Sequence, residues 1–221
     1  PKEELTIEQW KSFIDEVAPW RPAIELCAAE PLLYKGFLEI VEYIKRKGLV
    51  CRVFTNGFLL EEFAGRIKNA GVDAILVSVD GTAEVHDQIR GRKGLYSKVI
   101  QGLAILEKAP GRVKIAVDIN YTISDRNFTH LAAAYDQLIE KNVAFDRFTI
   151  IHTLFVNNEM VNRHNKLHSQ YPVKTICGSG INFDQIDINV LRMQINLLKL
   201  RDPKRVRVYP DFNQECLERW Y

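Results

Sequence analysis

Polar and acidic side chains recur in this sequence where short apolar runs end. Glu30 follows one run, Thr55 and Asn56 follow the next, and Asp80 closes a third. The full set that this pattern selects is Glu30, Thr55, Asn56, Ser78, Asp80, Asp118, Asn120, Tyr121, His152 and Thr153. The set contains neither lysine nor cysteine, and it does not resemble a nucleophile paired with a base. It suits the binding of a polar, partly cationic small molecule.

Most of these positions also have a purely structural interpretation. A carboxylate at Glu30 is stabilised by the dipole of a helix that follows it. Thr55-Asn56-Gly57 and Asp80-Gly81 are common turn sequences. Tyr121 and His152 are residue types that more often satisfy a structural role than a catalytic one. The residue types alone therefore leave both interpretations open.

Familiar phosphate and metal motifs do not explain these residues. The sequence has no GxGxxG after a predicted strand, no GxxxxGKS/T and no histidine triad. The segment Gly91-Arg92-Lys93-Gly94 is a weak match to a phosphate loop. A purely structural interpretation of His86 and Asp87, just before it, is that they pair with each other on the surface.

The elements that would position these residues alternate between short strands and longer helices. Apolar runs predict strands near 24–27, 50–54, 74–79, 113–121 and 148–155. Helical spacing predicts helices after Thr6, over about 34–47, around 59–67, and over about 97–107, 125–141 and 184–200. This alternation indicates an α/β fold with a parallel sheet, either a partial barrel or an open doubly wound sheet. In both, the carboxyl ends of the strands meet at one edge, where the selected side chains would converge.

The regular rhythm ends after the fifth predicted strand. A polar stretch covers 157–169, and a short run at 206–209 is a candidate edge strand. We expect residues 1–155 to form the barrel core and residues 156–221 to add a helical extension and an edge strand to the same domain.

Composition narrows the class of protein. The 221 residues include 30 basic and 28 acidic side chains, a net charge of +2, which argues against a nucleic-acid partner. No apolar run is long enough to span a bilayer, so no membrane partner is expected. The four cysteines are scattered, as in a protein of the reducing cytoplasm.

Taken in chain order, four segments resemble the radical AdoMet (radical SAM) superfamily. They are Ala28-Ala29-Glu30-Pro31-Leu32-Leu33, Phe54-Thr55-Asn56-Gly57, Val77-Ser78-Val79-Asp80-Gly81 and His86-Asp87-Gln88-Ile89-Arg90-Gly91. The resemblance covers roughly residues 5–155. Segments beyond it, 181–183 and Tyr209-Pro210, are similar to members with a SPASM-like C-terminal cluster region.

The resemblance implies a partial (βα)6 TIM-like barrel with parallel strands and a set of ligands for S-adenosyl-L-methionine (AdoMet). Glu30 and its neighbours would receive the amino group of the methionine moiety, Ser78 and Asp80 its carboxylate or the ribose, and Arg90 the carboxylate. The full set of cofactor-binding residues that it implies is Ala28, Ala29, Glu30, Pro31, Thr55, Asn56, Ser78, Asp80, Arg90 and Asn120. It also implies an iron–sulfur oxidoreductase with a 4Fe–4S cluster, acting on a peptide or protein substrate.

Two departures from the family pattern matter. Alanines occupy both glycine positions before Glu30, where each adds a methyl group near the ligand. The cluster-binding CxxxCxxC spacing occurs nowhere in the sequence. We expect the family's first strand and its cluster loop to be absent from this chain, the cluster ligands to lie outside it, and the chain alone to be inactive.

Two alternatives differ in class. One is a cluster-free module that binds an AdoMet-like small molecule at a degenerate site. The other is an unrelated barrel enzyme in which Glu30 and Asp80 act as acid and base.

Overall fold

The computed structural model describes residues 4–27, 29–111, 114–153, 158–173 and 181–220. Its strands are β1 (Ala23–Leu26), β2 (Val50–Thr55), β3 (Ala74–Ser78), β4 (Ala116–Thr122), β5 (Arg147–Ile151) and β6 (Val206–Tyr209). Its α-helices are α1 (Ile7–Val17), α2 (Phe37–Arg46), α3 (Leu60–Ala70), α4 (Ala83–Arg90), α5 (Leu95–Lys108), α6 (Leu131–Glu140), α7 (Asn158–Leu167), α8 (Ile188–Arg201) and α9 (Gln214–Trp220). Short 3-10 turns cover Ala18–Trp20, Pro31–Leu33 and Phe183–Gln185.

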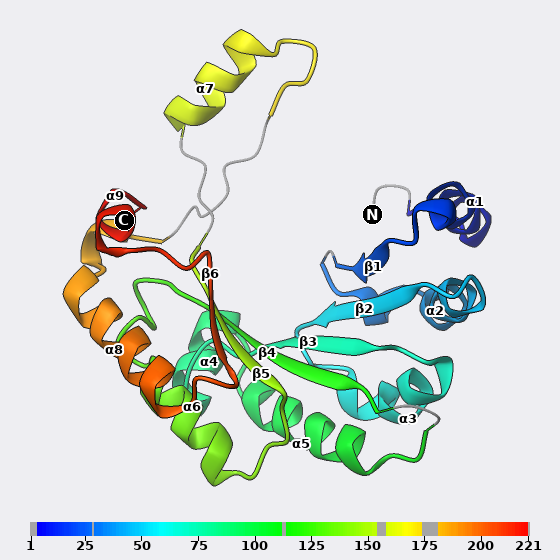
Figure 1. Cartoon of the computed structure of the whole chain (residues 1–221), viewed down its shortest axis with the longest axis horizontal. Helices are drawn as coiled ribbons and strands as arrows, with labels where there is room; N and C mark the ends of the chain where they lie inside the picture. Colours follow the sequence, from blue (N-terminus) through cyan, green and yellow to red (C-terminus); the bar gives the residue numbers. More distant parts are fainter. Residues whose placement is uncertain (1–3, 28, 112–113, 154–157, 174–180, 221) are drawn as a thin grey trace.

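The strands form one six-stranded sheet in the order β1-β2-β3-β4-β5-β6, and every neighbouring pair is parallel. The sheet curves, with helices outside the curve and an opening inside it (Figure 1). Strand order that follows chain order excludes a doubly wound sheet, in which the order reverses at a switch point. The expected partial (βα)6 barrel is confirmed, with a sheet that does not close.

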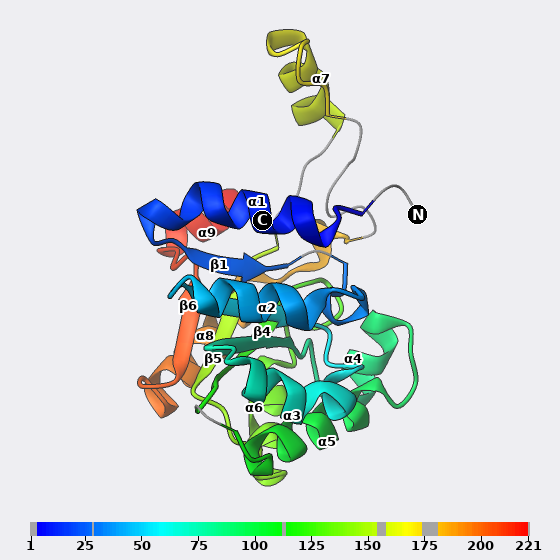
Figure 2. The same cartoon turned by 90° about the vertical axis from the view of Figure 1, so that its right-hand side faces the viewer.

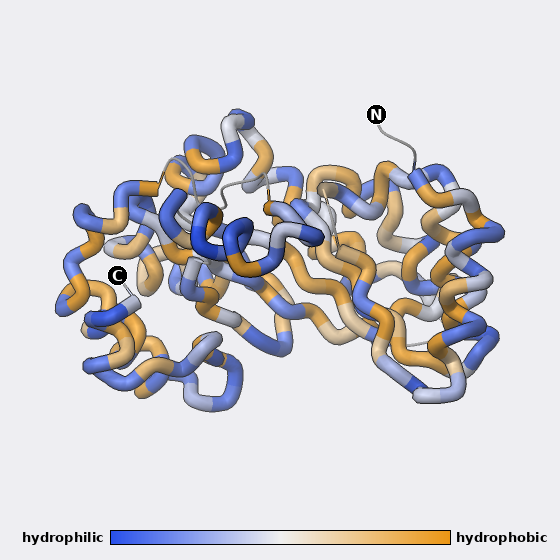
Figure 3. The backbone as a smooth tube through the Cα atoms, turned by 90° about the horizontal axis from the view of Figure 1, so that it is seen from above, coloured by the Kyte–Doolittle hydropathy of each residue, from blue (hydrophilic) through white to orange (hydrophobic). Residues whose placement is uncertain are grey.

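Alternating residues of the strands build the core against the helices. Val53 of β2, Val77 of β3 and Ile119 of β4 are fully buried. Their neighbours Phe54, Leu76 and Ser78 lie on the opposite, inner face and are partly exposed. Apolar backbone stretches accordingly run through the middle of the molecule (Figure 3). This alternation places the odd- and even-numbered residues of each strand in different environments.

Close packing of α3 against α5 depends on one small residue. A Cβ on Gly102 of α5 would lie 2.9 Å from the backbone nitrogen of Glu61 and 2.9 Å from the Cβ of Leu60. Both are α3 residues at or near its first turn. The two helices therefore touch through a position that tolerates no side chain.

The predicted strands and helices are present in the structure, although several of their boundaries differ. The structure also has three α-helices that the sequence analysis did not predict. The segment 125–130 forms turns, and α6 begins only at Leu131. The side chain of Asn127 accepts from the Ser124 amide at 2.6 Å and donates to the carbonyl oxygens of Asp80 and Thr122. These tertiary hydrogen bonds override the helical pattern there.

Helices α4, α7 and α9 were not expected from the sequence. Their residues are mostly polar, so apolar periodicity did not identify them. α7 lies within the stretch predicted to be irregular, and Figures 1 and 2 show it standing away from the sheet. The expected edge strand at 206–209 is present as β6. The predicted end of the fifth strand, at residues 154–155, lies outside the described residues.

Within the described part of the chain, no helix combines the length and the apolar character that crossing a membrane requires.

Candidate functional site

Glu30 joins the ends of β1 and β2. Its Oε1 accepts hydrogen bonds from the hydroxyl of Thr55 at 2.8 Å and from the amide of Leu32 at 3.2 Å. Its Oε2 accepts from the amide of Asn56 at 2.8 Å. The carboxylate is buried, and one of its functions is to cap the 3-10 turn that begins at Pro31. The structural and the binding interpretation of Glu30 are thus compatible, because a carboxylate oxygen accepts more than one hydrogen bond.

Turn geometry at the end of β2 holds Thr55 and Asn56 in place. The Thr55 hydroxyl accepts from the Gly57 amide at 3.0 Å, and the Asn56 side chain accepts from the Phe58 amide at 2.9 Å. Gly57 has φ of +78°, a conformation that glycine adopts without strain. Each of the three residues Glu30, Thr55 and Asn56 therefore has its orientation set by the other two or by the turn.

Asp80 and Arg90 form a second group at the end of β3. Arg90 donates from Nε and Nη2 to Oδ2 of Asp80 at 2.6 and 2.5 Å. Oδ1 of Asp80 accepts from the Thr122 amide at 3.0 Å, which ties the group to β4. The Asp80 side chain is 4% exposed and that of Arg90 31% exposed. The resemblance assigned both residues to a ligand, and in the structure they also bind each other.

The side chain of His86 binds the backbone of the turn at Asp80. It is fully buried, and its Nδ1 accepts from the Asp80 amide at 3.1 Å. Burial lowers the pKa of the imidazole, so it is held in the neutral form. Asp87 accepts from the amides of Gly94 and Tyr96, at the start of α5. The predicted surface pair of His86 and Asp87 is wrong, because each of these residues serves the backbone next to it.

Ser78, Asn120 and Thr149 lie side by side on the inner face of the sheet. Ser78 pairs with Asn120 in register, and Asn120 pairs with Thr149. Asn56 follows Thr55, whose register partner Val77 directly precedes Ser78. Asn120 is 7% exposed, and neither its amide group nor the Ser78 hydroxyl hydrogen-bonds to another described residue. These polar groups remain available to a ligand at the carboxyl ends of the strands.

The two small residues before Glu30 are only partly covered by the structure. Ala28 lies outside the described residues, and Ala29 is exposed. Pro31 begins the 3-10 turn. Ala29, Glu30 and Pro31 border a groove of about 640 Å³ that runs along β1 and is lined mostly by apolar residues of α1, β1, α2 and the segments between them. Figure 2 shows α1 lying over β1.

The described cysteines do not fit an iron–sulfur cluster. Cys51 is buried in β2, and desolvation raises the pKa of its thiol to about 12. Cluster ligation requires thiolates. Cys27 follows an apolar run of the sequence, which predicts a buried thiol, but in the structure it is exposed just after β1. Cys216 lies on α9, and Cys177 lies outside the described residues. No group of three or more metal-ligating side chains occurs among the residues that the structure describes.

Comparison with known proteins decides the family. The protein-family model that describes the radical SAM superfamily matches residues 1–138 of this sequence. The chain belongs to the radical SAM superfamily. Over 157 residues it is 36% identical to an AdoMet-dependent heme synthase of Methanosarcina barkeri, a match that covers 69% of this chain and 44% of that protein. Over 163 residues it is 31% identical to an Fe-coproporphyrin III synthase of the same organism, covering 72% of this chain and 39% of that protein.

A solved structure agrees with the fold of this radical SAM chain. Native anSMEcpe with bound AdoMet and a peptide superposes with a TM-score of 0.64 at 17% identity, covering 94% of this chain and 56% of that one. The chain spans less than half the length of the two curated relatives.

Sequence reasoning missed two supporting residues of the candidate site, His86 as a buried acceptor and Asn127 as a link between β3 and β4. The apolar pattern carries no signal for Asn127. His86 follows the Asp80-Gly81 turn by a few residues, and that spacing was the only available clue.

Proposed function

We propose that this chain binds AdoMet at the carboxyl ends of β1 to β4, through Glu30, Thr55, Asn56, Ser78, Asp80, Arg90 and Asn120, with the backbone of residues 28–31. AdoMet together with a reduced 4Fe–4S cluster would supply the 5′-deoxyadenosyl radical that abstracts hydrogen from a substrate. The residues of this chain would hold the methionine and ribose groups and keep water away from them.

One observation carries the proposal beyond family membership. Asn120 is a buried amide without a hydrogen-bond partner among the described residues, on the wall of the sheet beside Ser78. Neither the Asn120 amide group nor the Ser78 hydroxyl is among the fully buried polar atoms that lack a partner, so both are accessible from outside the protein and available to a polar ligand. Glu30 supports a cationic group of that ligand, since it brings a buried carboxylate to the same edge of the sheet.

We further propose that the cluster thiolates come from outside these 221 residues. The sequence holds four cysteines without CxxxCxxC spacing, and the high pKa of Cys51 opposes thiolate formation. Reconstitution of the chain alone with iron and sulfide, followed by absorbance and 5′-deoxyadenosine assays, should give no stable cluster and no AdoMet cleavage. A stable cluster on this chain would contradict the assignment.

Calorimetric titration of the chain with AdoMet tests the binding site directly. Ser78→Ala and Asn120→Ala should each weaken binding about tenfold, the value of one lost hydrogen bond. Ser97→Ala on α5 and Asn69→Ala on α3 change the same residue types at exposed positions and should leave binding unchanged. Equal affinities in all four variants would refute the site.

A second candidate function is a cluster-free module that binds an AdoMet-like molecule. Alanines at both glycine positions before Glu30 favour it, because each adds a methyl group near the ligand. The two candidates separate in a protein that contains this chain together with its natural flanking sequence. Radical chemistry requires AdoMet cleavage there, whereas a binding module would bind AdoMet and leave it intact.

The relatives are of two kinds, which differ in the class of substrate that their names give. The curated relatives at 36% and 31% identity are named for heme and coproporphyrin chemistry. The relative at 33% identity over 125 residues is a sporulation killing factor maturation protein, and anSMEcpe binds a peptide. From the sequence resemblance we propose a peptide or protein substrate. The side chains on the inner face of the sheet give separate evidence on the class of substrate.

A further inference from the structure

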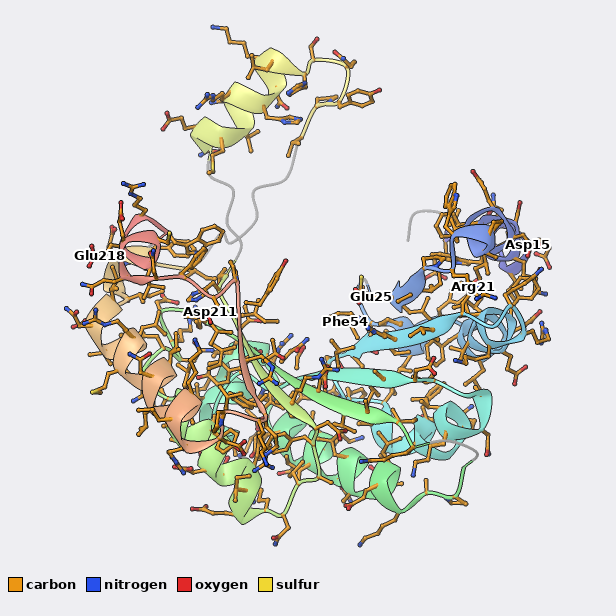
Figure 4. All side chains as sticks on the ribbon, viewed as in Figure 1. Asp15, Arg21, Glu25, Phe54, Asp211 and Glu218 are labelled. Carbon is orange, nitrogen blue, oxygen red and sulfur yellow. The ribbon has the colours of Figure 1, made fainter. Side chains whose placement is uncertain are left out.

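The inner face of the curved sheet carries two arginines on either side of a small, apolar strip. On β2, Arg52 pairs in register with Ala74 of β3, which pairs with Ala116 of β4. One step along the strands, Phe54 pairs with Leu76, Leu76 with Asp118, and Asp118 with Arg147 of β5. Figure 4 shows Glu25 and Phe54 on the side of β1 and β2 that faces the opening. The alanines leave room between the two guanidinium groups.

Each arginine is anchored by one carboxylate and retains unused donors. Arg52 donates from Nη1 to Glu25 at 3.1 Å, and Arg147 donates from Nε to Asp118 at 3.1 Å. Within the described residues neither guanidinium makes another hydrogen bond. The side chain of Arg52 is 44% exposed and that of Arg147 50% exposed. An arginine offers a fork of several N–H donors, so each guanidinium keeps donors that no described residue uses.

The pKa of the Asp118 carboxyl group is affected by the charges of both Arg52 and Arg147. The Asp118 side chain is 9% exposed, and desolvation is the main cause that raises the pKa of the carboxyl group. Arg147 lowers that pKa, and Arg52, two strands away, lowers it as well. The positive charge of Arg52 therefore reaches across the strip toward β4. With Glu25 and Asp118 each bound to an arginine, the hydrogen-bond donors left free at these register positions belong to the two guanidinium groups.

We infer that this wall binds the substrate, and that the substrate carries at least two carboxylates on an apolar body. This inference rests on the proposed function, of which it names the substrate class. Three strand spacings separate β2 from β5, about 14 Å along the sheet and less across its curve. A small anion with one charge would reach a single arginine. An apolar body would lie over Phe54, Leu76 and the two alanines while its carboxylates bind Arg52 and Arg147 through their free N–H groups.

This chemistry favours a small polycarboxylate over a peptide. A peptide has backbone N–H and C=O groups that need hydrogen-bond partners. The apolar side chains of the strip between the arginines provide none. A rigid apolar body loses no hydrogen bonds there and gains from burial.

The probe is coproporphyrin III, an apolar macrocycle with propionate carboxylates, titrated into the chain and followed by its absorbance and fluorescence. Arg52→Gln and Arg147→Gln should each weaken binding at least about tenfold, as expected for the loss of a charge-assisted hydrogen bond. Arg66→Gln, an exposed arginine on α3 paired with Glu62, is the matched control and should bind as the parent chain does. The porphyrin with its carboxylates amidated should bind the parent chain about as weakly as coproporphyrin III binds a variant that carries both Arg52→Gln and Arg147→Gln.

A second variant serves as a control for loss of folding. Arg147→Gln leaves the buried Asp118 carboxylate without its partner, so Asp118→Asn combined with Arg147→Gln removes both charges. Circular dichroism confirms the fold of each variant before titration. Loss of porphyrin binding in this folded double variant supports the inference, and retention of binding overturns it.

AdoMet binding, measured separately, distinguishes this inference from the proposed function. Arg52→Gln and Arg147→Gln should bind AdoMet normally. If AdoMet binds but coproporphyrin III binds equally to the arginine variants and to Arg66→Gln, the inference fails alone. If an acidic peptide binds through the same arginines while the porphyrin does not, the wall serves peptides and the inference is also wrong. If AdoMet itself does not bind, the proposed function fails first.

Discussion

The guanidinium of Arg90 binds one carboxylate oxygen of Asp80 through two nitrogens, at 2.5 and 2.6 Å, while the other oxygen accepts from the Thr122 amide. This pair closes the loop between β3 and α4 and ties it to β4. His86 holds the Asp80 amide from the other side. The turn that carries the candidate AdoMet ligand Asp80 is thus fixed at its backbone and at its side chain.

Removing this pair should destabilise the fold in a graded way. We expect Asp80→Ala to cost about 3 kcal/mol of unfolding free energy, because it leaves the Thr122 amide and Arg90 without their acceptor. Arg90→Ala should cost less, about 1–2 kcal/mol, since its side chain is 31% exposed and the interaction is partly screened. Urea denaturation measures both. The exposed pair of Arg66 and Glu62 supplies the control, where Arg66→Ala should change stability by less than about 0.5 kcal/mol. Equal effects at Asp80 and Arg66 would contradict the role of the pair.

Two glycines on neighbouring helices should respond oppositely to alanine. Gly102→Ala places a methyl group 2.9 Å from the Glu61 nitrogen and should cost about 1–3 kcal/mol through overpacking of α3 against α5. Nothing lies within 4 Å of a Cβ at Gly65, so Gly65→Ala should stabilise the chain by up to about 1 kcal/mol through helix propensity. Thermal unfolding compares the two variants. A destabilised Gly65→Ala variant would contradict the packing described for α3.

Thiol labelling should separate Cys27 from Cys51. Cys27 is exposed, whereas Cys51 is buried with a pKa raised to about 12 by desolvation. At about pH 8 a thiol reagent should modify Cys27 within minutes and leave Cys51 unmodified until the chain unfolds. Cys216 is also exposed and should react quickly, so peptide mass mapping identifies each site, and Cys27→Ser should remove only the Cys27 peptide from those labelled in the fast phase. Rapid labelling of Cys51 in the folded chain would show that β2 is not closed by the helices.

Stability should fall on acidification because of His152. This side chain is buried after β5 with its ring against Phe212, and desolvation lowers its pKa from 6.5 to about 4. The folded chain keeps the imidazole neutral, while the unfolded chain takes up a proton below pH 6.5. The contribution is therefore fully present above pH 6.5 and is lost as the pH falls toward 4, by about 3 kcal/mol in total.

The measurement is urea unfolding at a series of pH values. Carboxylates also titrate in this range, so the decisive quantity is the difference in pH dependence between the parent chain and His152→Gln. That difference should correspond to the uptake of about one proton on unfolding. Identical pH dependence in the two chains would show that His152 is not held neutral.

Much of the fold could be read from the sequence, because burial leaves a periodic trace. Strands buried on the helix side produce apolar runs such as Ala74–Val79 and Phe148–Ile151, and each of these runs corresponds to a strand. The polar residues after them, Glu30, Asn56 and Asp80, lie at the same edge because parallel strands all end there. The family assignment rested on these residues in chain order, and the comparison confirmed it. By itself, then, the sequence determined the strands, the edge and the family.

Only the tertiary structure decided which of these side chains bind one another. The pairing of Asp80 with Arg90 depends on α4, a short and mostly polar helix that was not expected from the sequence. The late start of α6 depends on Asn127, which donates to the carbonyl oxygens of Thr122 on β4 and of Asp80 in the loop after β3. The alignment of Arg52 with the alanines, and of Asp118 with Arg147, depends on strand register. Apolar periodicity records how deeply a residue is buried, whereas register and twist determine its neighbours, and those arise only when the strands pack together.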